Sequence, residues 1–596
     1  MCGFAGEIRT DGTAPDLVAL EQMSQVLAPR GPDGAGSWTH AQVGLVHRRL
    51  KIIDLSERGA QPMIDSERQL AIVFNGCIYN HHDLRAELRA GGQQFTSESD
   101  TEVILASYDH WGRERFADHL VGMFAFAIVE MSPGGSVVLC RDRLGIKPLY
   151  LADVQGGMRF ASTLPALLAG GGIDTALDPI ALHHYLSFHS VVPAPLTILR
   201  GVRKLPPATL LTVGPAGEPT RRTYWAPAFS RSAGHAAMDA DDWRDAVLER
   251  LRVAVRRRMV ADVPVGVLLS GGLDSSLIVA LLAEAGMASD LQTFAIGFSD
   301  AGQREGNEFR YSDLVASQYG THHHQIEVAD EEVVSALDDA IAAMSEPMVS
   351  HDVVAFHLLS REVSQHLKVI QCGQGADEVF AGYLWYPPLR AVSGLGDDTY
   401  ADEFIDRPHA DILDELTPEY RLDRDPSRAF VRDHFALPGA DTPLDRALRL
   451  DTEVMLVDDP VKRLDNMTMA WGLEARTPFL DHELVELAAA CPPEHKLAHG
   501  GKGVLKEAAR ALLPNEVIDR PKGYFPVPLL SHLAGPGLQH ITDALTTPQA
   551  RGRGVFNQSN VDRLLANPNR QLTRLEGNRL WQIALLEIWL GAQGIA

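Results

Sequence analysis

The second residue of the chain is a cysteine whose position could make it a nucleophile. Removal of Met1 would leave Cys2 at the amino terminus, with a thiol and a free α-amine on one residue. The amine could then deprotonate the thiol, which is one way of activating a weak nucleophile. A cysteine alone predicts little, because a free cysteine is more often a small buried apolar residue. The neighbouring motifs must therefore decide the role of Cys2.

A second motif that could do chemistry lies in the middle of the chain. The apolar run Val263–Leu269 predicts a strand buried on both faces of a parallel sheet. Small residues follow at Ser270–Ser276, and Leu277–Leu282 then predicts a helix. Backbone N–H groups in such a turn can approach a phosphate, and the start of the helix favours the negative charge. The Gly-x-x-x-x-Gly-Lys-Ser/Thr loop of P-loop enzymes is absent here.

Five motifs in the first third of the chain accompany Cys2 in a fixed order. They are Arg30–Asp33, His47–Leu50, Asn75–Asn80, Ser99–Glu102 and Arg141–Tyr150. Together with the start Cys2–Gly6, this segment resembles a class II glutamine amidotransferase domain, which hydrolyses the side-chain amide of glutamine. The resemblance covers essentially the whole first third and rests on several independent motifs.

The resemblance assigns roles to five of these residues. It makes Cys2 the nucleophile, with the Asn75 side-chain amide and the Gly76 N–H as donors to the developing oxyanion. Loss of one such donor costs about 2.7–4 kcal/mol of transition-state stabilisation. Arg49 would bind the α-carboxylate of glutamine, and Asp100 would pair with its α-ammonium group. Cys77 stands where many relatives have glutamate, which leaves any substrate contact by that side chain open.

The Ser270 loop resembles the pyrophosphate-binding loop of ATP pyrophosphatases, which cleave ATP between the α and β phosphates. Gly373–Tyr383, Leu473–Asp481 and Gly501–Lys506 then follow in the order of asparagine synthetases. The resemblance implies that ATP is a substrate. Its expected binding residues are Leu269, Ser270, Gly271, Gly272, Asp274, Ser275, Gly373 and Gln374.

Three further residues have expected roles in this second site. By the same resemblance, Asp274 and Asp377 would bind Mg²⁺, a hard cation that prefers carboxylate and phosphate oxygens. Lys502 matches the family lysine near the reacting carboxyl group and the α-phosphate, and Lys506 is the competing candidate. On an amphipathic helix, either lysine could equally be a solvated cation.

These motifs imply an α/β protein of two domains. The expected architecture is an N-terminal αββα sandwich of the N-terminal nucleophile type, the class II glutaminase, over residues 2–213. A doubly wound α/β domain of the ATP-pyrophosphatase type would span 241–596. Gly and Pro residues between 214 and 240 predict a linker, and helical patterning resumes at Trp243. The helical pattern Leu580–Leu590 could either cap the core or form a subunit contact, so a homodimer stays open.

Composition restricts the class of partner and the compartment. The formal net charge of −24 argues against nucleic acid, whose phosphates need a basic face. No apolar run approaches the roughly 20 residues that cross a bilayer, and the start has no signal pattern, so we expect a cytoplasmic enzyme without a membrane partner. The five cysteines, at an odd count without close pairing, do not suggest disulfides or a zinc site. His322–His324 is interpreted as the edge of a strand rather than a metal site.

A glutaminase joined to an adenylating domain implies one overall reaction. A carboxylate resists attack by ammonia until adenylation provides a better leaving group. Ammonia must also arrive unprotonated, which explains an enclosed passage between the two sites. By resemblance, the products are a carboxamide, glutamate, AMP and pyrophosphate, and the small-molecule partners are glutamine, ATP and the acceptor.

The acceptor is inferred from Gln374, which stands where asparagine synthetases usually have glutamate. This loop, together with Met1–Arg9 and Ala181–His189, most resembles the N-acetylglutaminylglutamine amidotransferase branch, which makes an osmoprotectant. We therefore favour that dipeptide over aspartate, the acceptor of asparagine synthetase. A non-catalytic regulatory paralogue and a ring-closing synthetase are further alternatives, and the retained Cys2 argues against both.

Overall fold

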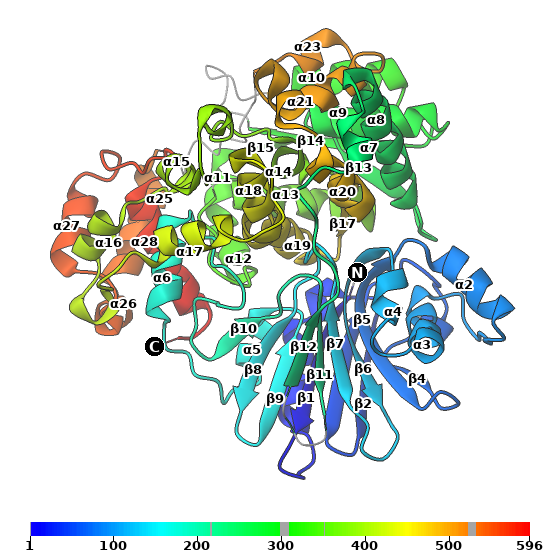
Figure 1. The fold of residues 1–596 in the computed structure, drawn as a ribbon. Helices are drawn as coiled ribbons and strands as arrows, with labels where there is room; N and C mark the ends of the chain where they lie inside the picture. Colours follow the sequence, from blue (N-terminus) through cyan, green and yellow to red (C-terminus); the bar gives the residue numbers. More distant parts are fainter. Residues whose placement is uncertain are drawn as a thin grey trace.

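The computed structural model describes residues 2–214, 217, 219–298, 309–350, 352–521 and 532–595. The chain forms two domains stacked end to end, with a twelve-stranded sandwich below a helix-rich α/β domain (Figure 1). The chain begins close to the junction between them (Figure 1). The expected two-domain α/β architecture is therefore confirmed.

The N-terminal domain is built on two six-stranded sheets packed face to face. The first sheet contains, in spatial order, β10 (Val202–Lys204), β8 (Tyr150–Val154), β9 (Gly157–Ala161), β1 (Gly3–Arg9), β3 (Val43–Arg49) and β2 (Gly34–His40). The second contains β12 (Pro219–Thr223), β11 (Thr209–Val213), β7 (Val137–Arg141), β6 (Gly122–Glu130), β5 (Leu70–Ile78) and β4 (Met63–Asp65). Alternating apolar residues such as Phe4, Val73 and Leu139 fill the space between the sheets.

Helices cover the outer face of each sheet and complete the αββα sandwich. The first sheet carries α1 (Leu17–Val26) and α5 (Leu164–Ala169), and the second carries α2 (His81–Ala90), α3 (Asp100–Trp111) and α4 (Phe116–His119). A buried cluster that includes Phe74, Val103 and Phe126 lies between the second sheet and its helices. The sandwich fixes the ends of β1, β3 and β5, where the predicted glutaminase residues lie.

The segment 214–240, expected to be a linker, contributes a strand to the sandwich. Strand β12 pairs antiparallel with β11, with Leu211 opposite Arg221. Its sequence, Pro-Thr-Arg-Arg-Thr, is polar and mostly exposed because β12 is the edge strand of its sheet. Without a buried face the strand has no apolar alternation, so the sequence pattern did not predict it.

The C-terminal domain is organised around a parallel five-stranded sheet. Its spatial order is β15 (His322–Val328), β14 (Gln292–Phe298), β13 (Val265–Leu268), β16 (Val369–Gln371) and β17 (Glu474–Arg476). Strands β14 and β15 are added on one side of β13, and β16 and β17 on its other side, so the sheet is doubly wound. The switch point lies between β13 and β16. In such sheets, ligands bind beyond the carboxyl ends of the strands at this switch point.

Helices pack on both faces of this sheet because successive buried residues of the central strand point to opposite sides. Val267 joins the cluster formed with α8 (Ala240–Arg257), α9 (Leu273–Glu284) and α10 (Phe309–Tyr319). Leu268 joins the cluster formed with α12 (Leu337–Ala342), α13 (Asp352–Ser364) and α19 (Lys462–Met469). The strand expected over 263–269 and the helix expected after it are both present.

Further helices complete the structure. They are α6 (Pro179–Ser187), α7 (Ala233–Ala236), α11 (Asp330–Ser335), α14 (Ala376–Phe380), α15 (Asp397–Phe404), α16 (His409–Glu415), α17 (Pro426–Phe435), α18 (Pro443–Leu450), α20 (His482–Ala490), α21 (Pro493–Leu497), α22 (Gly503–Ala509), α23 (Asn515–Ile518), α25 (Gly535–Thr546), α26 (Pro548–Arg553), α27 (Gln558–Ala566) and α28 (Arg579–Ala592). Two π-helical turns, η5 (Asp451–Met455) and η6 (Val457–Val461), join α18 to α19.

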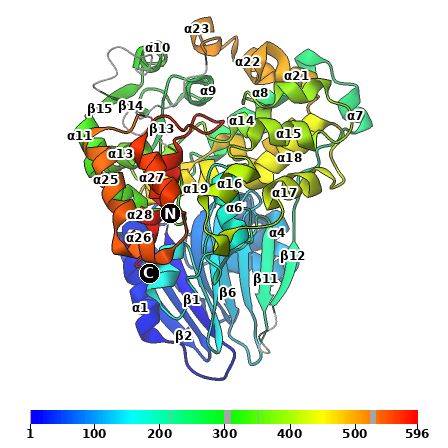
Figure 2. The ribbon, with the colours of Figure 1, turned by 90° about the vertical axis from the view of Figure 1, so that its left-hand side faces the viewer.

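The final helix, α28, caps the core of its own chain. Trp581, Leu585 and Trp589 are fully buried or nearly so. Helix α28 lies with α25, α26 and α27 on one side of the molecule and also packs on α12 (Figure 2). Of the two roles left open for this helix, capping the core is the one observed.

Candidate active sites

The predicted glutaminase residues converge at the top of the sandwich. Cys2 immediately precedes β1 and is 7% exposed, and its backbone N–H donates a 3.1 Å hydrogen bond to Asn75 Oδ1. Asn75 Nδ2 is buried and has no hydrogen-bond partner among the described residues. A buried donor without a partner is costly unless a ligand uses it, so this geometry suits a group that binds an oxyanion.

The next residue, Gly76, must be glycine because of its close neighbours. A Cβ atom at this position would lie 2.1 Å from the carbonyl oxygen of Met123 on the paired strand β6. The backbones of β5 and β6 therefore lie so close together here that a Cβ atom on residue 76 has no room. Gly76 lines a small cavity together with Cys2.

Arg49 and Asp100 approach the same cavity from two other elements. Arg49 ends β3, is buried, and donates 2.8 Å and 2.5 Å hydrogen bonds to the carbonyl oxygens of Ser56 and Asp54. Asp100 begins α3, and its carboxylate accepts a 3.0 Å hydrogen bond from the Ile78 N–H. The loop after β3 and the first turn of α3 thus fix an opposite pair of charges around the cavity.

Burial changes the protonation behaviour of two groups at this site. It raises the pKa of the Cys2 thiol above its ordinary value, so the thiol needs a base to become a nucleophile. It also raises the pKa of Asp100 to about 6; Glu474 adds to this shift, and the Ile78 N–H and Arg476 oppose it. A bound ammonium group would reverse the effect on Asp100 by stabilising its charged form.

The C-terminal domain supplies part of the glutaminase wall, which the sequence did not predict. Glu474 and Arg476 on β17 line the cavity beside Cys2 and Cys77. Arg476 donates a 2.6 Å hydrogen bond to Glu474 and two more, of 2.8 and 2.7 Å, to backbone carbonyls after α8. The family motif Leu473–Asp481 was the available signal, but it carried no assigned role. The cavity is the smaller of the two candidate sites, at about 30 Å³.

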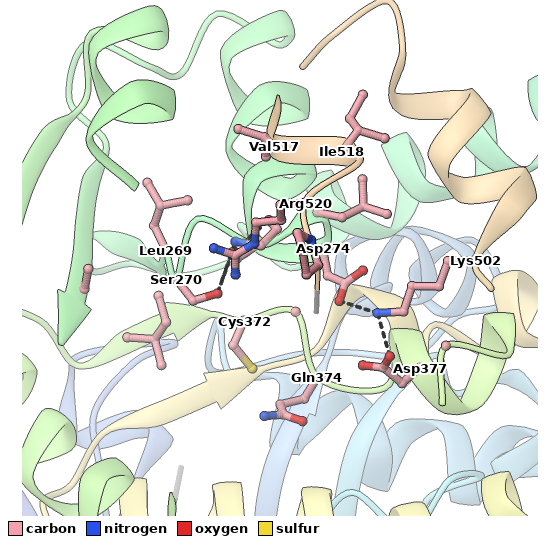
Figure 3. A pocket seen from close by; sticks show the side chains of 18 of the residues that line it. Leu269, Ser270, Asp274, Cys372, Gln374, Asp377, Lys502, Val517, Ile518 and Arg520 are labelled. Carbon is pink, nitrogen blue, oxygen red and sulfur yellow. Dashed lines mark hydrogen bonds and ion pairs between the residues drawn. The ribbon is translucent and has the colours of Figure 1, made fainter. Parts of the chain in front are cut away.

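A larger cavity of about 620 Å³ lies at the switch point of the parallel sheet (Figure 3). The predicted residues that line it are Leu269, Ser270, Gly272, Asp274, Ser275, Gly373, Gln374, Asp377 and Lys502. They come from the ends of β13 and β16, the start of α9, α14, and the residue before α22. The topology therefore brings together segments that lie more than 200 residues apart.

Gly271 is the predicted loop residue that does not line the cavity. It turns the chain with φ at +70°, and a Cβ atom would lie 2.5 Å from the backbone nitrogen of Ser312. Gly272 then begins α9 without a side-chain cap for the first helical N–H groups. The start of α9 therefore faces the cavity with donors that suit a phosphate.

Lys502 lies between the two predicted magnesium ligands. Its ammonium group is 2.6 Å from Asp274 Oδ2 and 2.8 Å from Asp377 Oδ1 (Figure 3). Burial alone would lower the pKa of Lys502, but the two carboxylates outweigh it and the pKa is raised. The competing Lys506 instead donates a 2.6 Å hydrogen bond to the His499 carbonyl. Both lysines line the cavity, and Lys502 contacts both predicted magnesium ligands.

Arg520 is a cation in this cavity that the sequence did not single out (Figure 3). Its Nη2 lies 3.6 Å from the position of a Cβ atom built on Gly272, and its guanidinium covers the Tyr311 ring at 4.7 Å. No motif surrounds Arg520, and only the fold brings it to the start of α9. A positive charge at this point complements a phosphate bound by the loop.

Buried ion pairs link the two domains between their sites. Asp465 on α19 pairs with Arg30 at 2.9 Å and with Lys147 at 3.2 Å, and all three side chains are buried. Lys204, on β10, pairs with Asp458 at 2.7 Å and with Glu346 at 3.0 Å. These contacts fix the orientation of the glutaminase domain against the sheet that carries the larger cavity.

Comparison with known proteins identifies the family. The family model described as asparagine synthase matches residues 246–591, and a glutamine amidotransferase domain matches residues 1–225. The chain belongs to the asparagine synthase family, whose members are ATP-dependent carbon–nitrogen ligases that use glutamine.

Three relatives illustrate the extent of the match. Asparagine synthetase [glutamine-hydrolyzing] 1 of Bacillus subtilis is 32% identical over 89% of this chain and 87% of its own. A putative asparagine synthetase of Mycobacterium bovis is 32% identical over 99% and 97%, respectively. Asparagine synthetase B of Escherichia coli is 31% identical over 88% of this chain and 82% of its own.

Among the residues described, no helix has the length and apolar character needed to span a membrane.

Proposed function

We propose that this enzyme transfers nitrogen from glutamine to a carboxylate that it first activates with ATP, releasing AMP and pyrophosphate. The observation that carries the proposal is the presence, in one chain, of the Cys2–Asn75 pair and of the cavity where Lys502 joins Asp274 and Asp377. Relatives named as glutamine-hydrolysing asparagine synthetases support the same reaction class.

In the glutaminase half-reaction, the Cys2 thiolate attacks the side-chain carbonyl of glutamine. The oxygen that becomes negative lies against Asn75 Nδ2 and the Gly76 N–H, which stabilise it. Arg49 and Asp100 hold the α-carboxylate and the α-ammonium group. The α-amine of Cys2, which took up the thiol proton, returns it to the departing nitrogen so that ammonia leaves, and water then releases glutamate from the thioester.

In the synthetase half-reaction, the loop at Ser270–Ser275 and the start of α9 bind the pyrophosphate end of ATP. Asp274 and Asp377 both contact the Lys502 ammonium group, so their carboxylates lie close enough together to be the proposed ligands of one Mg²⁺ ion, which would take the place of that contact. When bound, Mg²⁺ would neutralise phosphate charge. Lys502 and Arg520 stabilise the negative charge on the phosphates during adenylation and on the pyrophosphate that leaves.

Ammonia formed at Cys2 must reach the adenylate without meeting bulk water. The buried pairs of Asp465 with Arg30 and Lys147 keep the two domains closed against each other. We propose an enclosed passage through this junction.

We also assign the enzyme to the cytoplasm, where free thiols persist, because all five cysteines are buried and unpaired.

The proposed acceptor is N-acetylglutaminylglutamine, whose amide would serve as an osmoprotectant. Among the described residues, four carboxylates line the cavity, and each has a cation beside it. Asp274 and Asp377 face Lys502, Asp352 pairs with Arg463 at 3.1 Å, and Asp519 pairs with Arg510 at 2.6 Å.

An acceptor with a free ammonium group, such as aspartate, would need a carboxylate that is not already paired. A blocked, neutral amino end does not need one, and the neutral Gln374 suits it. Aspartate remains the alternative acceptor, and the names of the relatives favour it.

The test offers aspartate and N-acetylglutaminylglutamine separately to the enzyme with ATP, Mg²⁺ and glutamine, and identifies products by mass spectrometry. We expect the amidated dipeptide and little asparagine. The variant Gln374→Glu should lose dipeptide amidation while its glutamine hydrolysis is retained. Efficient asparagine formation with no amidated dipeptide would restore the aspartate assignment.

A further inference from the structure

Three side chains that commonly bind metals meet outside both cavities. His183 on α6, His409 on α16 and Asp425 at the start of α17 offer ligand atoms that all lie within 4.8 Å of one another. His183 Nε2 is 2.9 Å from His409 Nδ1 and 3.9 Å from Asp425 Oδ1. None of the three lines either active-site cavity. Within the described residues, this is the one such group of three.

A neighbouring hydroxyl group orients the central histidine. Ser427 Oγ lies 2.9 Å from His183 Nδ1 and 3.0 Å from His184 Nδ1. Because Ser427 occupies Nδ1, the other ring nitrogen of His183 points toward His409 and Asp425. Histidines that bind metals almost always have their second nitrogen held by a hydrogen-bond partner of this kind.

The carboxylate is also held in place before any ion binds. Asp425 caps α17 by accepting hydrogen bonds of 2.9 and 3.0 Å from the N–H groups of Ser427 and Arg428. His183 is 1% exposed, whereas His409 and Asp425 are half-buried. The cluster thus has a rigid inner side and an outer side that a hydrated ion can approach.

We propose that His183, His409 and Asp425 bind Zn²⁺. In a tetrahedral zinc site with bonds of about 2.0–2.1 Å to nitrogen, ligand atoms lie about 3.3 Å apart. The separations of 2.9 and 3.9 Å bracket this value, and the third pair, His409 with Asp425, lies within 4.8 Å, so side-chain shifts that even out these distances complete the site. Two imidazoles and one carboxylate suit zinc, with water as the fourth ligand. The proton between the two imidazoles moves to Nε2 of His409 by a change of tautomer.

The site would join two parts of the chain that are distant in sequence. Helix α6 lies in the sequence between strands β9 and β10 of the glutaminase sandwich, whereas α16 and α17 belong to the helical layer of the C-terminal domain, and α6 packs on both (Figures 1 and 2). The bound ion would fasten the connection between β9 and β10 of the first domain to the second domain. Its role is structural, and it does not depend on which acceptor the enzyme uses.

The test uses the full-length protein, stripped with a chelator and titrated with Zn²⁺ or with Co²⁺ as a spectroscopic probe. We expect one zinc per chain by elemental analysis, the visible absorption of tetrahedral Co²⁺, and a higher thermal midpoint with Zn²⁺. His409→Ala should abolish stoichiometric binding. Asp425→Asn should weaken binding by at least tenfold while it keeps the helix cap, because asparagine caps as well as aspartate.

The exposed His322 provides a matched control, because it is a histidine outside the cluster on strand β15. His322→Ala should bind zinc as the wild type does. Absence of stoichiometric zinc in the wild type, or equal binding by the wild type, His409→Ala and Asp425→Asn, would overturn the proposal. If His409→Ala does not fold, zinc binding is compared between the wild type and Asp425→Asn.

Discussion

Asn75 uses both ends of its side-chain amide at the glutaminase site. Its oxygen holds the Cys2 backbone N–H at 3.1 Å, and this contact directs the amide nitrogen toward the place where the oxyanion forms. The variant Asn75→Asp keeps the acceptor and removes the donor. We expect glutamine hydrolysis to fall by about 10²–10³ in kcat, with a smaller change in KM.

Steady-state glutaminase assays, with Asn557→Asp as a matched control, would measure this effect. Asn557 caps α27 in the other domain, and aspartate preserves such a cap. A kcat within a factor of three of the wild type in Asn75→Asp would exclude Asn75 as an oxyanion donor.

Asp100 makes glutamine binding depend on pH. Because its pKa is raised to about 6 in the free enzyme, the carboxylate is protonated below that pH and cannot pair with the α-ammonium group. The glutamine Kd should therefore rise about tenfold for each pH unit below 6 and level off above it. Calorimetric titration of the Cys2→Ala variant from pH 5 to 8 separates this effect from chemistry at the thiol.

Asp100→Asn should bind glutamine weakly and show no such slope. A pH slope in Asp100→Asn equal to that of the parent protein would assign the titration to another group.

At the scale of elements, the start of α9, α14 and the residue before α22 converge on one point. Asp274 and Asp377 come from the two helices and Lys502 from the third segment. Asp274→Asn or Asp377→Asn should eliminate ATP-dependent amidation and leave glutamine hydrolysis close to the wild-type rate. Parallel assays of glutamate and pyrophosphate release check this. Equal loss of both activities would indicate a folding defect rather than loss of a magnesium ligand.

Local patterns predicted the elements of this centre but not all of its walls. The apolar run before Ser270 and the small residues after it predicted β13, its loop and α9, because each depends on neighbours in sequence. Arg520 and Arg476 reach their sites only through packing across the fold. No local pattern marks Arg520, and the motif that contains Arg476 does not tell which site that side chain enters. The edge strand β12 was missed for a related reason, since its polar residues have no buried face.

At the scale of the molecule, the domains meet through buried charges rather than a purely apolar surface. The Asp465 carboxylate pairs with both Arg30 and Lys147. Removing its negative charge would leave these two buried cations without this counter-charge. We expect Asp465→Asn to lower the free energy of unfolding by about 3–5 kcal/mol. It should also raise the glutamate formed per amide above one, because the closed junction is disturbed.

Thermal unfolding and product ratios test both effects. Asp153→Asn is the control, because its pair with Arg203 is exposed and should contribute at most about 1 kcal/mol. An Asp465→Asn protein as stable and as tightly coupled as the control would remove the proposed role of this junction.

The measurement that tests the central claim most directly follows the nitrogen and the phosphate in one reaction. The enzyme is given amide-¹⁵N glutamine, α-phosphate-labelled ATP, Mg²⁺ and N-acetylglutaminylglutamine, with unlabelled ammonium in the medium. We predict ¹⁵N in the amide product, label in AMP, and one AMP for each amide formed. The Cys2→Ala variant should incorporate only unlabelled ammonium. Label in ADP, or ¹⁵N incorporation by Cys2→Ala at the wild-type rate, would contradict the account.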